Sequence, residues 1–215
     1  GNLNEITTGQ DNIIVGGSGN TNSGSSFSNI VGGSLNTIPS GQFNGIYNAT
    51  SSSNSGTNRS NIFSGNTNSI TTGDDNVIVG GQENTNSGVD NNSIFGGDQN
   101  SITGGEGIIT NVIVGGSNNT NSGNSSNIFG GNTNEITNGN DNVIVGGSGN
   151  TNSANSRSSI FGGSLNTIGG GNFNGIINAT SSSNSGNNRS NIFGGDNNSI
   201  TDGDDNVIVG GSGNT

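Results

Sequence analysis

The chain has 215 residues, of which 23% are hydrophobic and 43 are glycine, and its formal net charge at neutral pH is −11. Ordinary globular domains are about 45–50% apolar on a count that includes glycine. Glycine supplies almost half of that count in this chain, so too few apolar side chains remain to build a conventional compact core. The only basic residues are Arg59, Arg157 and Arg189, and no apolar run approaches the roughly 20 residues of a membrane-spanning helix. Because nucleic-acid binding needs a cationic surface, we expect neither a nucleic-acid partner nor direct membrane insertion.

The residue types that usually carry catalysis are missing. Cysteine, histidine and lysine are absent, which removes disulfides, zinc sites, thiol and amine nucleophiles and the imidazole base. We therefore expect a protein that is not an enzyme and has no catalytic residue, cofactor or metal. A composition rich in glycine, asparagine and serine is also typical of disorder, but the periodicity of the chain argues against that interpretation.

Short apolar words recur in register along the chain, starting with NIIVGG at 12–17. The central isoleucine of each word is taken as its marker. The markers are Ile14, Ile30, Ile46, Ile62, Ile78, Ile94, Ile113, Ile128, Ile144, Ile160, Ile176, Ile192 and Ile208. Successive markers are 16 residues apart, except for one step of 19 after Ile94 and one of 15 after Ile113. Such regularity is the signature of a repeat architecture.

Other positions keep the same register. The residue six after the marker is asparagine in nearly every word, with Ser52 and Ser182 as exceptions: Asn20, Asn36, Asn68, Asn84, Asn100, Asn119, Asn134, Asn150, Asn166, Asn198 and Asn214. The residue eight after the marker alternates. One class has Asn22, Asn54, Asn86, Asn121, Asn152 and Asn184, and the other has Ile38, Ile70, Ile102, Ile136, Ile168 and Ile200. The true unit is therefore a pair of words.

A longer repeat lies above this one, because residues 1–85 align with residues 131–215 without gaps at a shift of 130. We expect one continuous domain over 1–215, made of a long repeat at 1–130 and a partial copy at 131–215. We also expect the natural protein to continue beyond this segment.

The words predict an all-β fold. Three-residue runs of valine, isoleucine and phenylalanine bounded by glycine, asparagine and serine are typical of strands and turns, and a helix would disfavour so much glycine. Sixteen residues fit two short strands and two corners, with Gly16 and Gly17 and their equivalents forming a corner that needs positive φ. The sequence predicts a parallel β-solenoid of about 13 coils, in which the marker isoleucines form an apolar ladder and the asparagines six residues later form a buried, hydrogen-bonded amide ladder.

The strand words are apolar on both faces. In Val77-Ile78-Val79 the isoleucine points one way and the two valines point the other, which is typical of a strand buried on both sides. Because the sequence offers no helix as a cover, we expect neighbouring chains to cover the outer face, most simply in a parallel homotrimer. The covering residues are Val15, Val31, Val79, Val114, Val145, Val209, Phe63, Phe95, Phe129, Phe161 and Phe193.

Two words carry a resemblance to a known family. NIIVGGSGNTNSG at 12–24 and SNIFGGNTNEI at 126–136 resemble the head repeats of trimeric autotransporter adhesins, and similar words are found in fibre proteins of phages and giant viruses. The resemblance implies a left-handed parallel β-roll of three chains and attachment at a bacterial surface. The present repeats are longer than those of the family, and Gly-Gly replaces its usual single glycine.

Three local features have competing interpretations. GGSGNTNSG at 16–24 is similar to the calcium-binding β-roll nonapeptide, but Thr21 and Thr151 occupy its aspartate position. The GDDN turns at 73–76 and 203–206 are expected to be solvated rather than metal-binding. The long step after Ile94 contains GGEGIITN at 104–111, either a tolerated insertion or a loop that displays Glu106, Ile108 and Ile109.

These observations favour an extracellular or cell-surface structural or adhesive fibre segment that self-associates as a homo-oligomer and, in one variant, polymerises end to end through its exposed strand edges. The alternative is an ice-binding solenoid, although the threonine column seven residues after the marker is interrupted by serine and Glu135. A polysaccharide-cleaving β-helix is the third hypothesis, and the thin spread of acidic residues disfavours it.

Overall fold

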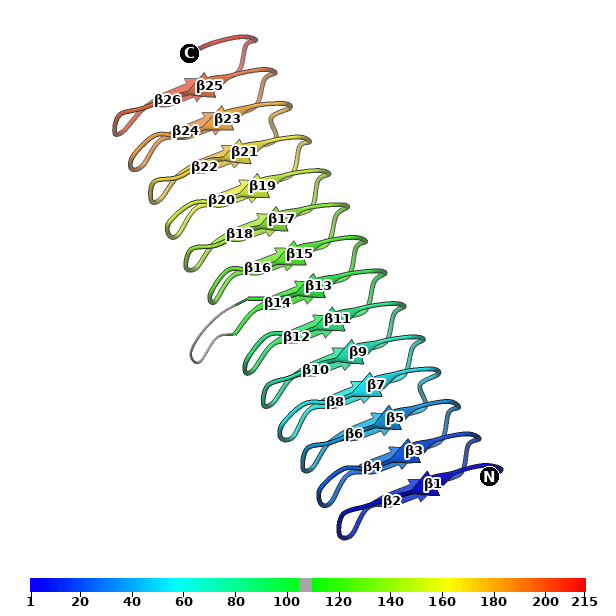
Figure 1. Cartoon of the computed structure of the whole chain (residues 1–215). Coiled ribbons are helices and arrows are strands. Elements are labelled where there is room, and N and C mark those ends of the chain that lie inside the picture. The colour runs from blue at the N-terminus through cyan, green and yellow to red at the C-terminus, as the bar shows by residue number, and fades with distance from the viewer. Residues whose placement is uncertain (105–109) are drawn as a thin grey trace. The chain divides into compact units, whose positions relative to one another are not determined.

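The structure is a computed structural model that describes residues 1–104 and 110–215. These residues contain short β-strands and no helix, and they fall into two compact units, Gly1–Thr110 and Asn111–Thr215. Within each unit similar coils are stacked on one another (Figure 1). The prediction of an all-β parallel solenoid with a 16-residue coil is thereby confirmed. The prediction that residues 1–215 form a single continuous domain stays a prediction.

Each coil contributes one strand of three residues and one of two residues, so each unit has two parallel sheets, here called the wide sheet and the narrow sheet. The wide sheet of the first unit contains β2 (Ile13–Val15), β4 (Asn29–Val31), β6 (Gly45–Tyr47), β8 (Asn61–Phe63), β10 (Val77–Val79) and β12 (Ser93–Phe95). Its narrow sheet contains β1 (Glu5–Ile6), β3 (Thr21–Asn22), β5 (Thr37–Ile38), β7 (Ser53–Asn54), β9 (Ser69–Ile70), β11 (Thr85–Asn86) and β13 (Ser101–Ile102).

The second unit repeats this arrangement. Its wide sheet contains β14 (Val112–Val114), β16 (Asn127–Phe129), β18 (Val143–Val145), β20 (Ser159–Phe161), β22 (Gly175–Ile177), β24 (Asn191–Phe193) and β26 (Val207–Val209). Its narrow sheet contains β15 (Thr120–Asn121), β17 (Glu135–Ile136), β19 (Thr151–Asn152), β21 (Thr167–Ile168), β23 (Ser183–Asn184) and β25 (Ser199–Ile200).

The register of the sheets places like residues above one another. In the first unit Ile62 pairs with Ile78 and Ile78 pairs with Ile94, and Phe63, Val79 and Phe95 form the neighbouring column. The second unit pairs its strands in the same way, from Val112–Asn127 to Asn191–Val207. One coil is therefore one turn of the solenoid, and a sequence repeat becomes a straight column of side chains about 4.8 Å apart.

The core of each coil is a pair of inward-facing residues, one from each sheet. The marker isoleucines from Ile30 to Ile94 and from Ile113 to Ile192 have no exposed surface, and the isoleucines of the alternating position from Ile38 to Ile168 are equally buried. Every second coil has a fully buried asparagine at that alternating position, such as Asn22 or Asn54. The solenoid is therefore thin, and its interior is partly polar.

The asparagine column six residues after the marker is buried from Asn20 to Asn198 and bonded through the main chain of the next coil. The side-chain oxygen of Asn20 accepts a bond from the main-chain N–H of Asn36 at 3.0 Å, and that of Asn36 accepts from the N–H of Ser52 at 3.1 Å. The amide nitrogen of Asn36 donates to the carbonyl of Ala49 at 2.7 Å. We expected bonds from amide to amide, but most run between side chain and main chain. Direct amide bonds occur at Asn68–Asn84, Asn134–Asn150 and Asn198–Asn214, at 3.2, 3.1 and 2.9 Å.

A second polar column lies 14 residues after the marker, where asparagine and serine largely alternate. Where the alternating position is asparagine, as at Asn22, its amide donates to the carbonyl of Ser28 at 2.7 Å and its oxygen accepts from the N–H of Gly24 at 3.1 Å. Where that position is isoleucine, as at Ile38, the larger Asn44 donates to the carbonyl of Gly56 at 2.5 Å. The two kinds of coil therefore bond main-chain groups of this corner through asparagines at different positions. This difference explains why the repeating unit of the sequence is a pair of words.

Many turn residues have positive φ although they are not glycine. Gly16 and Gly17 both have φ of 72°, as the corner requires, but Phe27 has φ of 53° and Leu35 of 56°. A left-handed conformation costs an L-residue about 1–2 kcal/mol. Hydrogen bonds between coils offset this cost, because the N–H of Phe27 donates to Gln10 and that of Leu35 to Ser18, at 2.9 and 3.0 Å.

Candidate functional surfaces

The wide sheet of each unit carries an exposed apolar column, here called the apolar stripe, formed by the residue that follows each marker. In the first unit it contains Val15, Val31, Tyr47, Phe63, Val79 and Phe95. In the second it contains Val114, Phe129, Val145, Phe161, Ile177, Phe193 and Val209. All of these positions except Tyr47 and Ile177 were predicted from the sequence to lie on the outer face. All of them point away from the coil interior and are half-buried or exposed.

The stripe exposes enough apolar surface to matter energetically. Phe129, Phe161 and Phe193 are 44%, 43% and 41% exposed. If a phenylalanine side chain has about 200 Å² of surface, these three expose about 250 Å² together. Contiguous apolar patches of a few hundred Å² on a monomer often mark an interaction site. In the first unit the ring of Tyr47 stacks on that of Phe63 at a centroid distance of 5.0 Å.

The stripe alternates in size along most of its length. Coils with the word Val-Ile-Val, as in Val77–Val79, alternate with coils in which a polar residue precedes the marker and phenylalanine follows it, as in Asn61–Phe63 and Ser93–Phe95. Because these side chains point outward, the fold of a single coil does not need this alternation. It creates a ridged surface, with a large ring next to a small valine.

Charge is distributed away from the wide sheet. Among the described residues, neither outward column of the wide sheet contains an acidic or basic side chain, although the chain has 14 acidic residues. All three arginines lie together with aspartates in a separate turn column. Arg59 binds Asp75 through two bonds of 2.7 and 2.6 Å, and Arg189 binds Asp205 through two bonds of 2.5 and 2.8 Å.

These ion pairs shift the acidity of their partners. The hydrogen bonds from the Arg59 guanidinium lower the pKa of Asp75 below its ordinary value, and those from Arg189 lower the pKa of Asp205. Hydrogen bonds from the amides of Gln99 and Gln82 lower the pKa of Glu83. All of these groups lie at the surface, so each pair contributes little to stability.

The narrow sheet has a different chemistry on its outer face, here called the hydroxyl face. Its first column lies seven residues after the marker and its second lies nine residues after it. In the first unit the hydroxyl-bearing members are Thr21, Thr37, Ser53, Ser69, Thr85 and Ser101 in the first column, and Thr7, Ser23, Ser55, Thr71, Ser87 and Thr103 in the second. Pro39 interrupts the second column. In the second unit Glu135 and Gly169 interrupt the two columns.

The hydroxyl face was only half recognised from the sequence. The column that begins at Thr21 was considered from the sequence, but the one that begins with Thr7 and Ser23 was not. The signal was available, because serine or threonine recurs nine residues after most markers. Some hydroxyls of the second column bond one another, with Thr71 donating to Ser87 at 2.8 Å and Thr137 to Ser153 at 2.7 Å.

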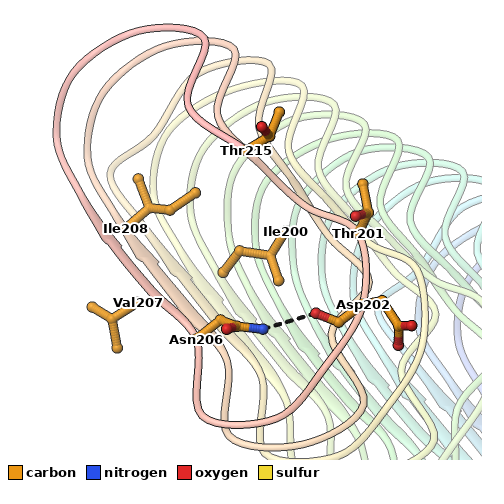
Figure 2. Close-up of a pocket in the computed structure, with 7 residues that line it drawn as sticks. All are labelled: Ile200, Thr201, Asp202, Asn206, Val207, Ile208 and Thr215. Atoms are coloured by element: carbon orange, nitrogen blue, oxygen red, sulfur yellow. Dashed lines mark hydrogen bonds between the residues drawn. The ribbon is translucent and has the colours of Figure 1, made fainter.

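A hollow of about 240 Å³ lies at the C-terminal end of the second unit (Figure 2). It is lined by Ile200, Thr201, Asp202, Asn206, Val207, Ile208 and Thr215. The amide of Asn206 crosses its rim and donates to the carbonyl of Asp202 at 2.8 Å. Ile200 and Ile208 occupy the positions that fill the interior of the other coils, so the hollow is the open interior of the last coil.

The positions considered for metal binding are not brought together. Thr21 and Thr151 lie in strands β3 and β19 of the hydroxyl face. The GDDN turns contain Asp74 and Asp75, which are half-buried, and Asp204 and Asp205, which are exposed. No group of three or more metal-binding side chains occurs in residues 1–104 and 110–215. Glu106, Ile108 and Ile109 of the insertion lie outside the described residues. The same described ranges hold no helix long and apolar enough to cross a membrane.

Comparison of the chain with protein-family models, with curated protein sequences and with solved structures gave no match. Any functional interpretation therefore depends on the two outer faces of the solenoid described above.

Proposed function

We propose that the chain is a structural segment of an extracellular or cell-surface fibre, and that copies of it associate laterally through the apolar stripe. The observation that carries the proposal is the stripe itself: an uncharged, half-exposed apolar column repeated on every coil of a chain with a net charge of −11. A surface that carried this charge would repel a second copy, whereas the wide sheet offers a face without it.

The energetics favour association through the whole stripe rather than through one residue. Two copies that bury the three phenylalanines of the second unit would remove about 500 Å² from water, which is worth about 12 kcal/mol at 25 cal/mol per Å². The entropic cost of association is of similar size, about 4–15 kcal/mol. The valine, isoleucine and tyrosine members of the stripe therefore supply the net gain. A length of many coils is what makes the contact stable.

The alternation of phenylalanine and valine supports a specific register. In a parallel assembly around one axis the copies are level with one another, so rings meet rings at every second coil of the second unit and the smaller side chains meet between them. A shift of one copy by one coil would lose this match, and columns that match in this way form dry interfaces between stacked sheets. A parallel homotrimer around one axis is the simplest closed assembly that buries a stripe on each chain. The resemblance to the head repeats of trimeric autotransporter adhesins implies, in addition, a left-handed solenoid and an adhesive role.

The experiment compares two substitutions in the same coil. Val79→Glu places a charge on the apolar stripe, and Thr85→Glu places the same charge on the hydroxyl face, where Glu135 already occupies the equivalent position of the second unit. Sedimentation velocity and negative-stain microscopy are expected to show rods or bundles for the wild type and Thr85→Glu, and single chains for Val79→Glu. A monomeric wild type, or equal assembly of both variants, would refute the proposal.

A further inference from the structure

We propose that the hydroxyl face of the narrow sheet in the first unit is an ice-binding surface, separate from the stripe through which copies associate. The first observation is its two-dimensional regularity. Its first column runs along successive strands in one register, from Thr21–Thr37 to Thr85–Ser101, and its second column lies one residue beyond the end of each strand. Strand spacing fixes a repeat of about 4.8 Å along each column and about 6.7 Å between the columns. The shorter repeat is close to the oxygen repeat of hexagonal ice.

The second observation concerns the hydrogen-bonding capacity of the first column. Each hydroxyl offers one donor and two acceptor positions. Within residues 1–104, the hydroxyls of Thr21, Thr37, Ser53, Ser69 and Thr85 make no side-chain hydrogen bond with the protein, although they are held in fixed strands and are half-buried. Their bonding capacity is therefore directed outward, and the sheet has already ordered them. Such preorganisation lowers the entropic cost of binding.

The third observation is what the face lacks. No aromatic or basic side chain lies in either of its columns within the described residues of the first unit, and Glu5 at its edge is the one acidic residue there. Aromatic platforms are what bind sugar rings or bases, and cationic groups are what bind anionic polymers. Apolar side chains would mark a protein partner, and the large exposed ones of this unit lie outside the two columns, on the wide sheet and in turns such as those of Phe27, Leu35 and Phe43. A repeating uncharged hydroxyl array matches the chemistry of crystalline water.

The serines that interrupt the threonine column still carry hydroxyls. The column at Thr21 is interrupted by serines if only threonine is counted, but every member from Thr21 to Ser101 carries a hydroxyl. The second column adds a parallel row from Ser23 to Thr103, interrupted only by Pro39. The surface is therefore a mixed serine and threonine array two columns wide.

The test uses two serines of the same coil. Ser53→Glu places a charge in the centre of the hydroxyl face. Ser51→Glu places the same charge in a turn column where Glu83 occurs naturally, with φ of 55° against 51° for Ser51. Glu135 shows that the first column also accommodates glutamate. Both variants are therefore expected to fold, which circular dichroism checks.

The measurement is the partition of protein into slowly grown ice, with albumin as an excluded reference. The wild type and Ser51→Glu are expected to be enriched in the ice several-fold over albumin, and Ser53→Glu is expected to fall to the albumin level. Exclusion of the wild type from ice, or equal partition of the two variants, would overturn the proposal. Retention of the wild type on insoluble cellulose or chitin with no enrichment in ice would also overturn it, because the ligand would then be a polysaccharide.

Discussion

Removal of one asparagine from the buried column tests how the coils are held together. The Asn36 side chain has no exposed surface. Its oxygen accepts from the N–H of Ser52 at 3.1 Å, and its nitrogen donates to the carbonyl of Ala49 at 2.7 Å. In Asn36→Ala the carbonyl of Ala49 keeps a second bond from the N–H of Ser34 at 3.1 Å, but the N–H of Ser52 loses its acceptor.

The magnitude follows from that difference. A buried donor left without a partner costs about 1–3 kcal/mol, and the lost amide bond adds about 0.5–1.5 kcal/mol, so Asn36→Ala should cost about 2–4 kcal/mol locally. Asn36→Ser is the matched control, because Ser52 and Ser182 occupy the same column and accept from Asn68 and Asn198 at 3.1 Å. Serine keeps the acceptor, so it should cost about 1 kcal/mol.

Amide hydrogen exchange at Ser52 is the suitable assay, because a repeat protein opens locally and a single global unfolding energy can hide the effect. At about 1.4 kcal/mol per tenfold, exchange should accelerate about 30- to 700-fold in Asn36→Ala and only several-fold in Asn36→Ser. Equal acceleration in the two variants would refute the reasoning, since it would mean that the buried acceptor is not what stabilises the coil contact.

Two further predictions concern the corners and the surface charges. Gly81→Ala should destabilise the chain much more than Gly80→Ala. A Cβ on Gly81 would lie 2.2 Å from the carbonyl oxygen of Gly97, whereas the nearest atom to a Cβ on Gly80 would be 3.7 Å away. The midpoints of urea unfolding of the two variants measure the difference, and equal midpoints would contradict the close packing of the corner. The pKa of Asp75 is lowered by the hydrogen bonds from Arg59, so the pair stabilises the folded chain above the ordinary value of 3.8 and loses this effect as the pH falls through the lowered pKa. Arg59→Gln should therefore lower the melting temperature slightly at neutral pH and not in strong acid, and a difference that persists in acid would assign the effect to packing instead.

The sequence predicted the coil because its period is regular. Most of the apolar words are followed by Gly-Gly or another small pair, and the columns that begin at Ile14 and Asn20 recur at 16 residues in almost every step, so stacking in register accounts for both patterns. The prediction that the column at Val79 points outward followed from the two-residue period of a strand. These features depend on local spacing, which a single sequence shows directly.

Other features depend on contacts that spacing alone does not show. Phe27 has no intrinsic preference for positive φ, and it adopts this conformation because Gln10 of the neighbouring coil accepts its N–H at 2.9 Å. The exchange of roles between Asn22 and Asn44 arises from which residue can reach the corner carbonyls. The second hydroxyl column was visible in the sequence, but its importance became apparent only when both columns were seen to share one face of the narrow sheet.

We expect the apolar stripe to be buried between copies of the chain while the hydroxyl face stays exposed. The natural chain has no cysteine, so a single Val79→Cys or Thr85→Cys substitution provides one thiol for labelling. The most direct measurement is the rate of thiol labelling as the protein concentration is raised. Protection at position 79 that increases with concentration, with a constant rate at position 85, is the predicted result, and a concentration-independent rate at position 79 would contradict the account.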